Sequence, residues 1–307
     1  MTSVKSQRLA RNAAIAAVAV SVLLVVAKAG AWLVGGSAAL LASLVDSMID
    51  ALMSFTNMLA LRYAHRPADT DHRYGHGKIE GVAALTQAAF ILGACAFVIL
   101  EAIRMFDQPR AVGAIDLGVA VLVAGTLLTV ALTRYQAYAV KKSHSLAVEA
   151  DAAHYTGDIV ANLGVIASLL AGRWLGWLWL DPLVALVVAG WLLYTARDIG
   201  LRAIDMLLDR ELADDTRTRM FDVIRATPGV EGLHDLRTRR SGARIMVAVD
   251  IEVDPGLSML AAHEIAHAVE NNLLASWPDA EVMIHVDPKG GDITDSRHRK
   301  LEGFHAR

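Results

Sequence analysis

Long apolar runs alternate with short polar connections over the first two thirds of the chain. A helix that crosses a bilayer needs roughly 20 predominantly apolar residues, and six segments reach that length. They lie at residues 12–34, 38–61, 79–105, 114–138, 145–171 and 178–203. The pattern therefore predicts a six-helix transmembrane bundle, all-α, within residues 1–207.

The pattern changes after residue 207, where the apolar runs become shorter. Helical periodicity occurs at residues 214–226 and 258–276, and strand-like patterns occur at 233–240, 244–253 and 281–286. In the second strand-like segment, Val247, Val249 and Ile251 alternate with more polar positions. This order of elements predicts a small cytoplasmic α+β domain over 208–290, ferredoxin-like (metallochaperone-like) in type, and a flexible polar tail at 291–307.

Composition supports a membrane domain joined to a soluble one. The chain is 55% hydrophobic and only 20% charged, with a mean hydropathy of +0.41, which is more apolar than an ordinary soluble chain. Its net charge of −3 excludes a strongly basic nucleic-acid-binding protein. It contains no phosphate-binding loop and no G-x-S-x-G motif, so we expect no bound nucleotide. Cys95 is the only cysteine and cannot form an intramolecular disulfide.

Positive charge predicts the orientation of the bundle, because Lys and Arg concentrate on the cytoplasmic side of a membrane. One side carries Lys5, Arg8, Arg11, Arg62, Arg66, Arg73, Lys78, Arg134, Lys141, Lys142, Arg197 and Arg202. The other carries Arg104, Arg110 and Arg173. Both termini are therefore predicted to be cytoplasmic. Lys28 lies within the first span, where we expect it to snorkel or to pack against the bundle.

Four ionisable residues inside the predicted spans give the strongest functional signal. Asp46 and Asp50 lie in the second span, and His154 and Asp158 lie in the fifth. Each pair has i, i+4 spacing, which puts both members on one helix face. Such groups are costly at membrane depth, and together they suit a tetrahedral site for a cation such as zinc. Because histidine must be neutral to bind a metal, a proton would compete with the ion at His154. The alternative is that these groups only form hydrogen bonds between packed helices, or lie near helix ends.

Four segments together resemble the cation diffusion facilitator family, and in particular its bacterial zinc and ferrous-iron efflux branch. They are SLVDSMID at 43–50, DTDHRYGHGKIE at 69–80, HYTGD at 154–158 and HDLRTR at 234–239. The resemblance implies a homodimeric metal/proton antiporter, not an enzyme, in the lipid bilayer of the bacterial inner membrane. It implies export of Zn2+ from the cytoplasm through Asp46, Asp50, His154 and Asp158, with Fe2+, Cd2+, Co2+ and Ni2+ as further candidate ions.

The polar connection after the second span offers a second ligand set. Asp69, His72 and His76 include a histidine pair at i, i+4 spacing, which is typical of metal binding. The resemblance implies a secondary metal site here, and a solvated loop is the alternative. It also implies a charge pair between Lys78 and Asp209, at the point where the membrane and soluble domains meet in the dimer.

The predicted soluble domain carries its own potential ligands. They are His234, Asp250, His263, His285 and Asp287, on three strand-like segments and one helix. The resemblance implies a two-metal site at these positions. The closest branch has histidine where this chain has Asp250, so the number of metals stays open. Surface histidines without a ligand role are the alternative.

Residues 263–267 match H-E-x-x-H, the signature of zinc metalloproteases. That chemistry would require His263 and His267 on zinc, Glu264 as the base and a third ligand, and no further H-x-x-G-x-x-H follows the motif. A membrane-bound metalloprotease is therefore an alternative of another class. A metal sensor that binds ions without moving them is a third.

Overall fold

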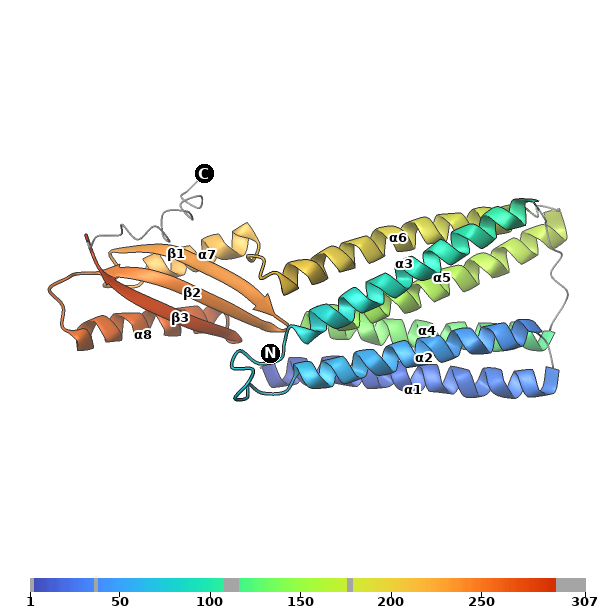
Figure 1. Ribbon diagram of the computed structural model, residues 1–307, viewed down its shortest axis with the longest axis horizontal. Helices are drawn as coiled ribbons and strands as arrows, with labels where there is room; N and C mark the ends of the chain where they lie inside the picture. The colour runs from blue at the N-terminus through green and yellow to red at the C-terminus, as the bar shows by residue number, and fades with distance from the viewer. Residues whose placement is uncertain (1–2, 36–37, 108–115, 176–178, 291–307) are drawn as a thin grey trace. The chain divides into compact units, whose positions relative to one another are not determined.

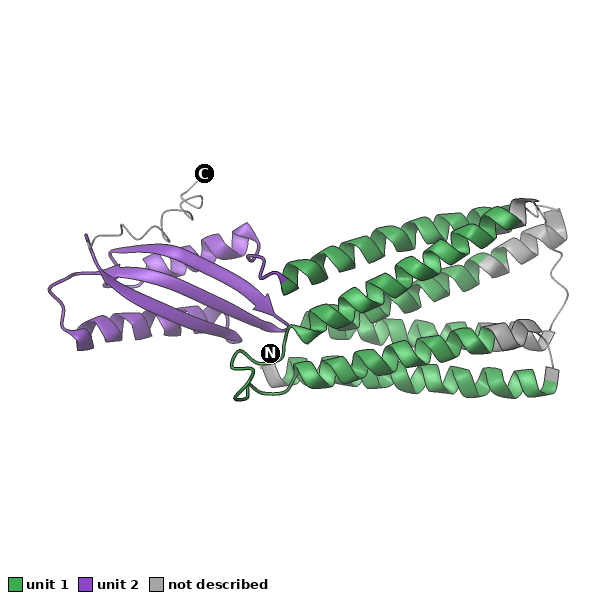
Figure 2. Ribbon diagram, viewed as in Figure 1, with its two compact units in different colours: residues 1, 3–207 green, residues 2, 208–307 purple. Residues whose placement is uncertain are grey.

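The protein is described by a computed structural model that covers residues 3–35, 38–107, 116–175 and 179–290. The chain divides into two compact units, one ending at Leu207 and the other beginning at Leu208 (Figure 2). The predicted tail at 291–307 lies outside the described residues. So do parts of the predicted connections, at 36–37, 108–115 and 176–178.

The first unit consists of long helices. Within the described residues these are α1 (Ser3–Gly35), α2 (Ala38–Ala64), α3 (Ile79–Asp107), α4 (Asp116–Ser143), α5 (Leu146–Leu175) and α6 (Leu180–Leu207). In that part of the chain, α1, α2, α3 and α6 are long and apolar enough to cross a membrane. In contrast, α5 carries several acidic side chains in its first half. The prediction of a helical membrane domain is confirmed.

Small side chains let these helices approach closely. Figure 1 shows α1 lying along α2 and along α4, and α3 lying along α6. Two buried clusters hold the helices together, and both are rich in alanine. One contains Ala10, Ala13, Ala14, Leu61, Ala139, Ala147 and Val148. The other contains Ala84, Ala88, Leu146, Ala150, Ile199, Ala203 and Met206.

The connection between α4 and α5 fixes where α5 begins. His144 has a left-handed conformation, with φ 53°, and its N–H donates to the Val140 carbonyl at 2.8 Å, which ends α4. The Ser145 carbonyl accepts the N–H of Glu149 at 3.1 Å in the first turn of α5. The Ser145 hydroxyl also donates to Glu80 on α3 at 2.7 Å. The start of the helix that carries His154 is therefore tied to α3.

The second unit is a three-stranded sheet with two helices. Its elements are α7 (Asp214–Arg225), β1 (Gly232–Ser241), β2 (Arg244–Val253), α8 (Met259–Ser276) and β3 (Ala280–Pro288). The strand order is β1-β2-β3, with β1 antiparallel and β3 parallel to β2. The parallel pair is joined through α8, as such a crossover requires. The prediction of a small α+β domain is confirmed.

The two faces of β2 have different chemistry. Val247, Val249 and Ile251 are buried against Met220 of α7 and Leu273 of α8, and so form the core. The predicted alternation in β2 is therefore confirmed. The intervening positions face the opposite side of the sheet. Asp250 lies there, paired in register with His234 on β1 and with His285 on β3.

Candidate metal centres

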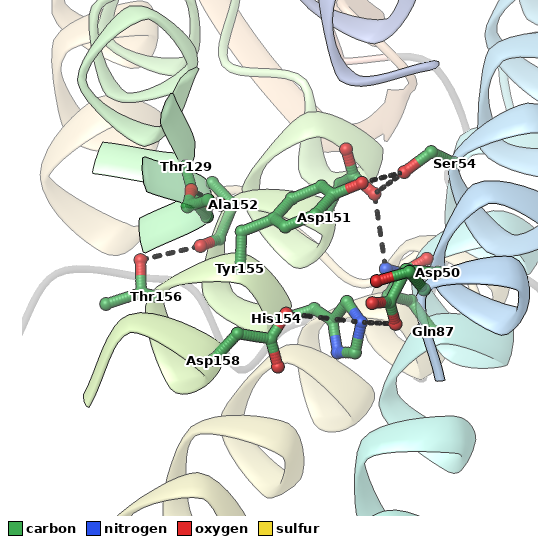
Figure 3. A network of polar contacts seen from close by, with 12 residues as sticks. Asp50, Ser54, Gln87, Thr129, Asp151, Ala152, His154, Tyr155, Thr156 and Asp158 are labelled. Atoms are coloured by element: carbon green, nitrogen blue, oxygen red, sulfur yellow. Dashed lines mark hydrogen bonds and ion pairs between the residues drawn. The ribbon is translucent and has the colours of Figure 1, made fainter. Parts of the chain in front are cut away.

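The first cluster joins α2 to α5. The His154 Nε2 atom lies 3.0 Å from Asp50 Oδ1 and 3.9 Å from Asp158 Oδ2. One ligand atom from each of these three residues lies within 4.8 Å of the others. His154 and Asp158 come from consecutive turns of α5 and face Asp50 across the helix interface (Figure 3). Two carboxylates and an imidazole so arranged could ligate one cation.

Asp46 lies one turn earlier on α2 and is more exposed than Asp50. The structure does not group it with the other three ligands. Beside it, Lys28 of α1 donates to the Ser43 carbonyl at 3.1 Å and to the Ser47 hydroxyl at 2.6 Å. The positively charged Lys28 side chain of α1 therefore lies against the segment of α2 that carries Asp46. The role of Asp46 as a ligand stays a prediction.

A buried polar network that was not predicted from the sequence lies next to this cluster. Asp151 of α5 is 1% exposed and accepts hydrogen bonds from Ser54, Gln87 and Gln136 at 3.2, 3.3 and 2.7 Å (Figure 3). Tyr155 lies 2.8 Å from the Ser54 hydroxyl. The available signal was the presence of two glutamines in apolar spans, together with an aspartate three residues before His154.

The second cluster lies in the connection between α2 and α3. Asp69 Oδ1 lies 3.2 Å from His72 Nδ1, and Asp69 Oδ2 lies 3.3 Å from His76 Nε2. The backbone N–H groups of Asp71 and His72 also donate to Asp69, at 3.0 and 2.7 Å. The pKa of Asp69 is lowered from its usual value, chiefly by the backbone hydrogen bond from His72. The three predicted residues are therefore adjacent, with Asp69 held in the ionised form that binds cations.

The third cluster lies on the outer face of the sheet. His234 Nδ1 lies 3.8 Å from Asp250, and His234 Nε2 lies 3.4 Å from Asp287 and 4.0 Å from Glu252. Asp287 also lies 3.1 Å from His285 Nε2. Burial raises the pKa of Asp250, and the facing His234 opposes that shift. Glu252 and Asp235, which the sequence analysis did not select, add two more acidic groups.

A local irregularity in β1 presents His234. The pairing register with β2 shifts between His234 and Arg237, and Asp235 within the shift has φ 51°. A bulge of this kind redirects the side chains beside it. The ligand atoms of His234, Asp235 and Asp250 consequently lie within 4.8 Å of one another.

His263 is exposed on α8, the helix that covers the apolar face of the sheet. Its ring centroid lies 6.2 Å from that of His267, and His267 Nδ1 instead lies 3.0 Å from the Asn271 amide. Among the residues that the structure describes, no third ligand joins these two histidines. The arrangement therefore gives no support to the metalloprotease alternative.

The two members of the predicted Lys78–Asp209 pair each have a contact inside their own unit. Lys78 donates to the Leu207 carbonyl at 3.2 Å. Asp209, which has φ 57°, lies 3.0 Å from Arg239. The pair would link one unit to the other, and it stays a prediction.

An apolar helical bundle with ionisable residues clustered between its helices is typical of membrane transporters of cations. Residues 14–208 match the cation efflux transmembrane domain, and residues 212–289 match the cation efflux protein cytoplasmic domain. The chain belongs to the cation efflux family, known also as the cation diffusion facilitator family. Its members are transporters of metal cations and are not enzymes.

Similar proteins cover nearly the whole chain. It is 43% identical over 281 residues to "Cation-efflux pump FieF" of Cronobacter sakazakii, covering 92% of this chain and 93% of that protein. It is 42% identical over 292 residues to the protein of the same name in Pectobacterium carotovorum, covering 95% and 97%. A solved structure, "Metal-bound C-terminal domain of CzcD transporter from Thermotoga maritima", is 35% identical with a TM-score of 0.24. That match covers 26% of this chain and 99% of the other.

Proposed function

We propose that this protein exports divalent metal ions, with zinc as the principal substrate, in exchange for protons. The observation that carries the proposal is the convergence of Asp50, His154 and Asp158 between α2 and α5. Asp46, one turn along α2, would complete a four-ligand site when the helices close on an ion. Nitrogen and oxygen ligands in this number are those that zinc accepts, and iron, cadmium, cobalt and nickel can use them too.

Proton exchange follows from the chemistry of the ligands. His154 binds a metal only through an unprotonated nitrogen, so the ion and a proton exclude one another there. The neighbouring carboxylates of Asp50 and Asp158 would stabilise whichever cation is present, the metal ion or the proton on His154. The bundle would bind metal while open to the cytoplasm, and protons would displace the metal on the other side.

The other two clusters would serve the same transport cycle. Asp69, His72 and His76 would receive ions on the cytoplasmic side. His234, Asp250, His285 and Asp287 would bind metal in the soluble domain. His263 lies on α8, which covers the apolar face of the sheet and not the face of this cluster, so it would ligate from the second protomer of a homodimer. Both termini would be cytoplasmic, with the bundle in the bacterial inner membrane and the Lys78–Asp209 pair at the junction of the two domains.

The test is zinc uptake into everted membrane vesicles with and without a proton gradient. Wild-type protein should transport only with the gradient, and Asp50→Ala should abolish transport. Glu101→Ala is the matched control, because Glu101 is a carboxylate on α3 that pairs with Arg104 at 3.6 Å, away from the cluster. Zinc uptake by Asp50→Ala at the wild-type rate would refute the site. Zinc binding without flux in the wild-type protein would favour the sensor alternative.

A further inference from the structure

One carboxylate lies where four helices meet. Asp151 of α5 receives a hydrogen bond from Ser54 on α2, from Gln87 on α3 and from Gln136 on α4. All four side chains are at most 3% exposed. Ser54 and Gln87 donate to Oδ1, whereas Gln136 donates to Oδ2. Helices α2, α3, α4 and α5 therefore each contribute one side chain to a single hydrogen-bond network.

Such a contact demands accurate helix placement. A buried carboxylate is costly unless hydrogen bonds compensate for the water it has lost. Moving one position along an α-helix means a rotation of about 100° and a shift of about 1.5 Å. A displacement of that size in α5 would separate Asp151 from all three donors. The network thus stabilises one rotation and one axial position of α5.

The contact between α2 and α5, which forms a seam along the two helices, also carries the metal ligands. Asp50, Ser54 and Asn57 follow one face of α2, and each contacts α5. Asp50 meets His154 at 3.0 Å, and Ser54 meets Asp151 at 3.2 Å. The Asn57 amide donates to the Ala147 carbonyl at 3.1 Å. Only the first of these three contacts belongs to the ligand cluster, so the other two can hold the seam whether or not an ion is bound.

We propose that Asp151 is a positioning residue for metal transport. Asp151 and His154 are one turn apart on the same face of α5. By fixing the rotation and depth of α5 through its three hydrogen bonds, Asp151 holds His154 and Asp158 opposite Asp50. The inference rests on the proposed function, because it assumes that these three residues bind the transported ion. Mutation of residues that orient metal ligands without binding the metal often lowers metal affinity or activity substantially.

The experiment measures zinc uptake against zinc concentration in everted vesicles, normalised to the folded transporter recovered by gel filtration. Asp151→Leu removes every acceptor and should raise the KM by about tenfold with little change in Vmax. Asp151→Asn keeps Oδ1 for Ser54 and Gln87, and its amide can donate to Gln136 once that side chain rotates. The Asn variant should therefore stay within about twofold of the wild-type KM. A wild-type KM in the Leu variant, or equal losses in both variants, would overturn the proposal.

Gln136→Leu provides a milder test if Asp151→Leu does not fold. It removes one donor and should raise the KM by about fivefold, which is the effect expected from the loss of one hydrogen bond. Thr126→Val is the matched control. It removes a different hydrogen bond between α4 and α5, from Asn162 at 3.2 Å, and should leave the KM unchanged. An unchanged KM in Gln136→Leu, or an equal rise in Thr126→Val, would contradict the assignment to Asp151.

Asp50→Ala distinguishes a failure of the ligand assignment from a failure of the positioning role. If Asp50→Ala transports normally, the ligand assignment itself fails. If Asp50→Ala abolishes transport while Asp151→Leu keeps the wild-type KM, the ligand assignment stands and only the positioning role fails.

Discussion

At the scale of single residues, His154 has the most specific role in the proposed site. The carboxylates of Asp50 and Asp158 attract any divalent cation, whereas the imidazole between them favours borderline ions such as zinc over harder ones such as manganese. The 3.0 Å contact from His154 to Asp50 also orients the ring. Ion choice should therefore depend on this one side chain.

The substitution His154→Asp should reduce zinc transport by about tenfold and raise the ratio of manganese to zinc transport, because an all-oxygen set suits harder ions. The measurement is uptake of both metals by the same vesicle preparation. His144→Asp is the control, since His144 is exposed in the turn between α4 and α5. An unchanged metal ratio in His154→Asp would count against this account of selectivity.

A second residue-scale prediction concerns the sheet cluster. Asp250→His should tighten zinc binding there by about tenfold, because imidazole is the softer ligand. Binding is measured by competition with a chelating dye, on the full chain carrying Asp50→Ala so that the intramembrane site does not contribute. Asp254→His is the matched control, because Asp254 is exposed after the end of β2. Equal affinities in the two variants would exclude Asp250 as a ligand.

Spacing within one element predicted which ligands lie together, whereas several polar contacts between elements were missed. The i, i+4 spacing paired His154 with Asp158, and the loop spacing paired His72 with His76. It did not predict that Gln87 and Gln136 meet Asp151, because the rotation and depth of each helix depend on packing with its neighbours. Glu252 was missed for a similar reason, since its neighbours depend on strand register.

At the scale of elements, the approach of α5 to α6 depends on a glycine beside the proposed ligands. A Cβ atom on Gly157 would lie 2.6 Å from Leu192 Cδ2. Gly157 directly precedes Asp158. Rotation of the Leu192 side chain could accommodate a single methyl group, whereas a branched side chain at position 157 should push this turn of α5 away from α6. The Asp151 network holds the same helix along its seam with α2.

Gly157→Val should therefore reduce zinc uptake by about tenfold through displaced ligands, and a second change, Leu192→Ala, should restore part of it by making room. Both are measured as uptake per folded transporter. Gly190→Val on α6 is the control, because a Cβ atom at Gly190 meets nothing within 4 Å. Failure of Leu192→Ala to improve Gly157→Val would show that the contact does not cause the loss.

Element types were predictable because their periodicities are strong. The alternation in β2 predicted its buried face, and the apolar runs predicted the positions of the long helices. The bulge at His234 could not be predicted, because no glycine marks it and an aspartate adopts the left-handed conformation instead. Strand order was also outside what periodicity can show, since it depends on how α8 crosses the sheet.

At the scale of the whole molecule, the distribution of positive charge leads to a prediction about topology. Cys95 is the only cysteine and is 1% exposed, so a Cys95→Ser background allows labelling at single introduced cysteines. Asp71→Cys and Gly256→Cys should react with a membrane-impermeant maleimide in everted vesicles. Arg110→Cys should react only in right-side-out vesicles. Labelling of Asp71→Cys from the outside would reverse the proposed orientation.

The alanine-rich faces of the bundle have a mechanical consequence. Alanine has no side-chain rotamer to lose or rearrange, and its short side chain leaves only shallow ridges on a helix. Where Ala84, Ala88 and Ala203 line the contact between α3 and α6, a small sliding movement displaces few side-chain atoms, in contrast to the seam fixed by Asp151. A reorienting bundle would therefore shear between α3 and α6, while α2, α3, α4 and α5, which are joined through Asp151, move as a rigid body.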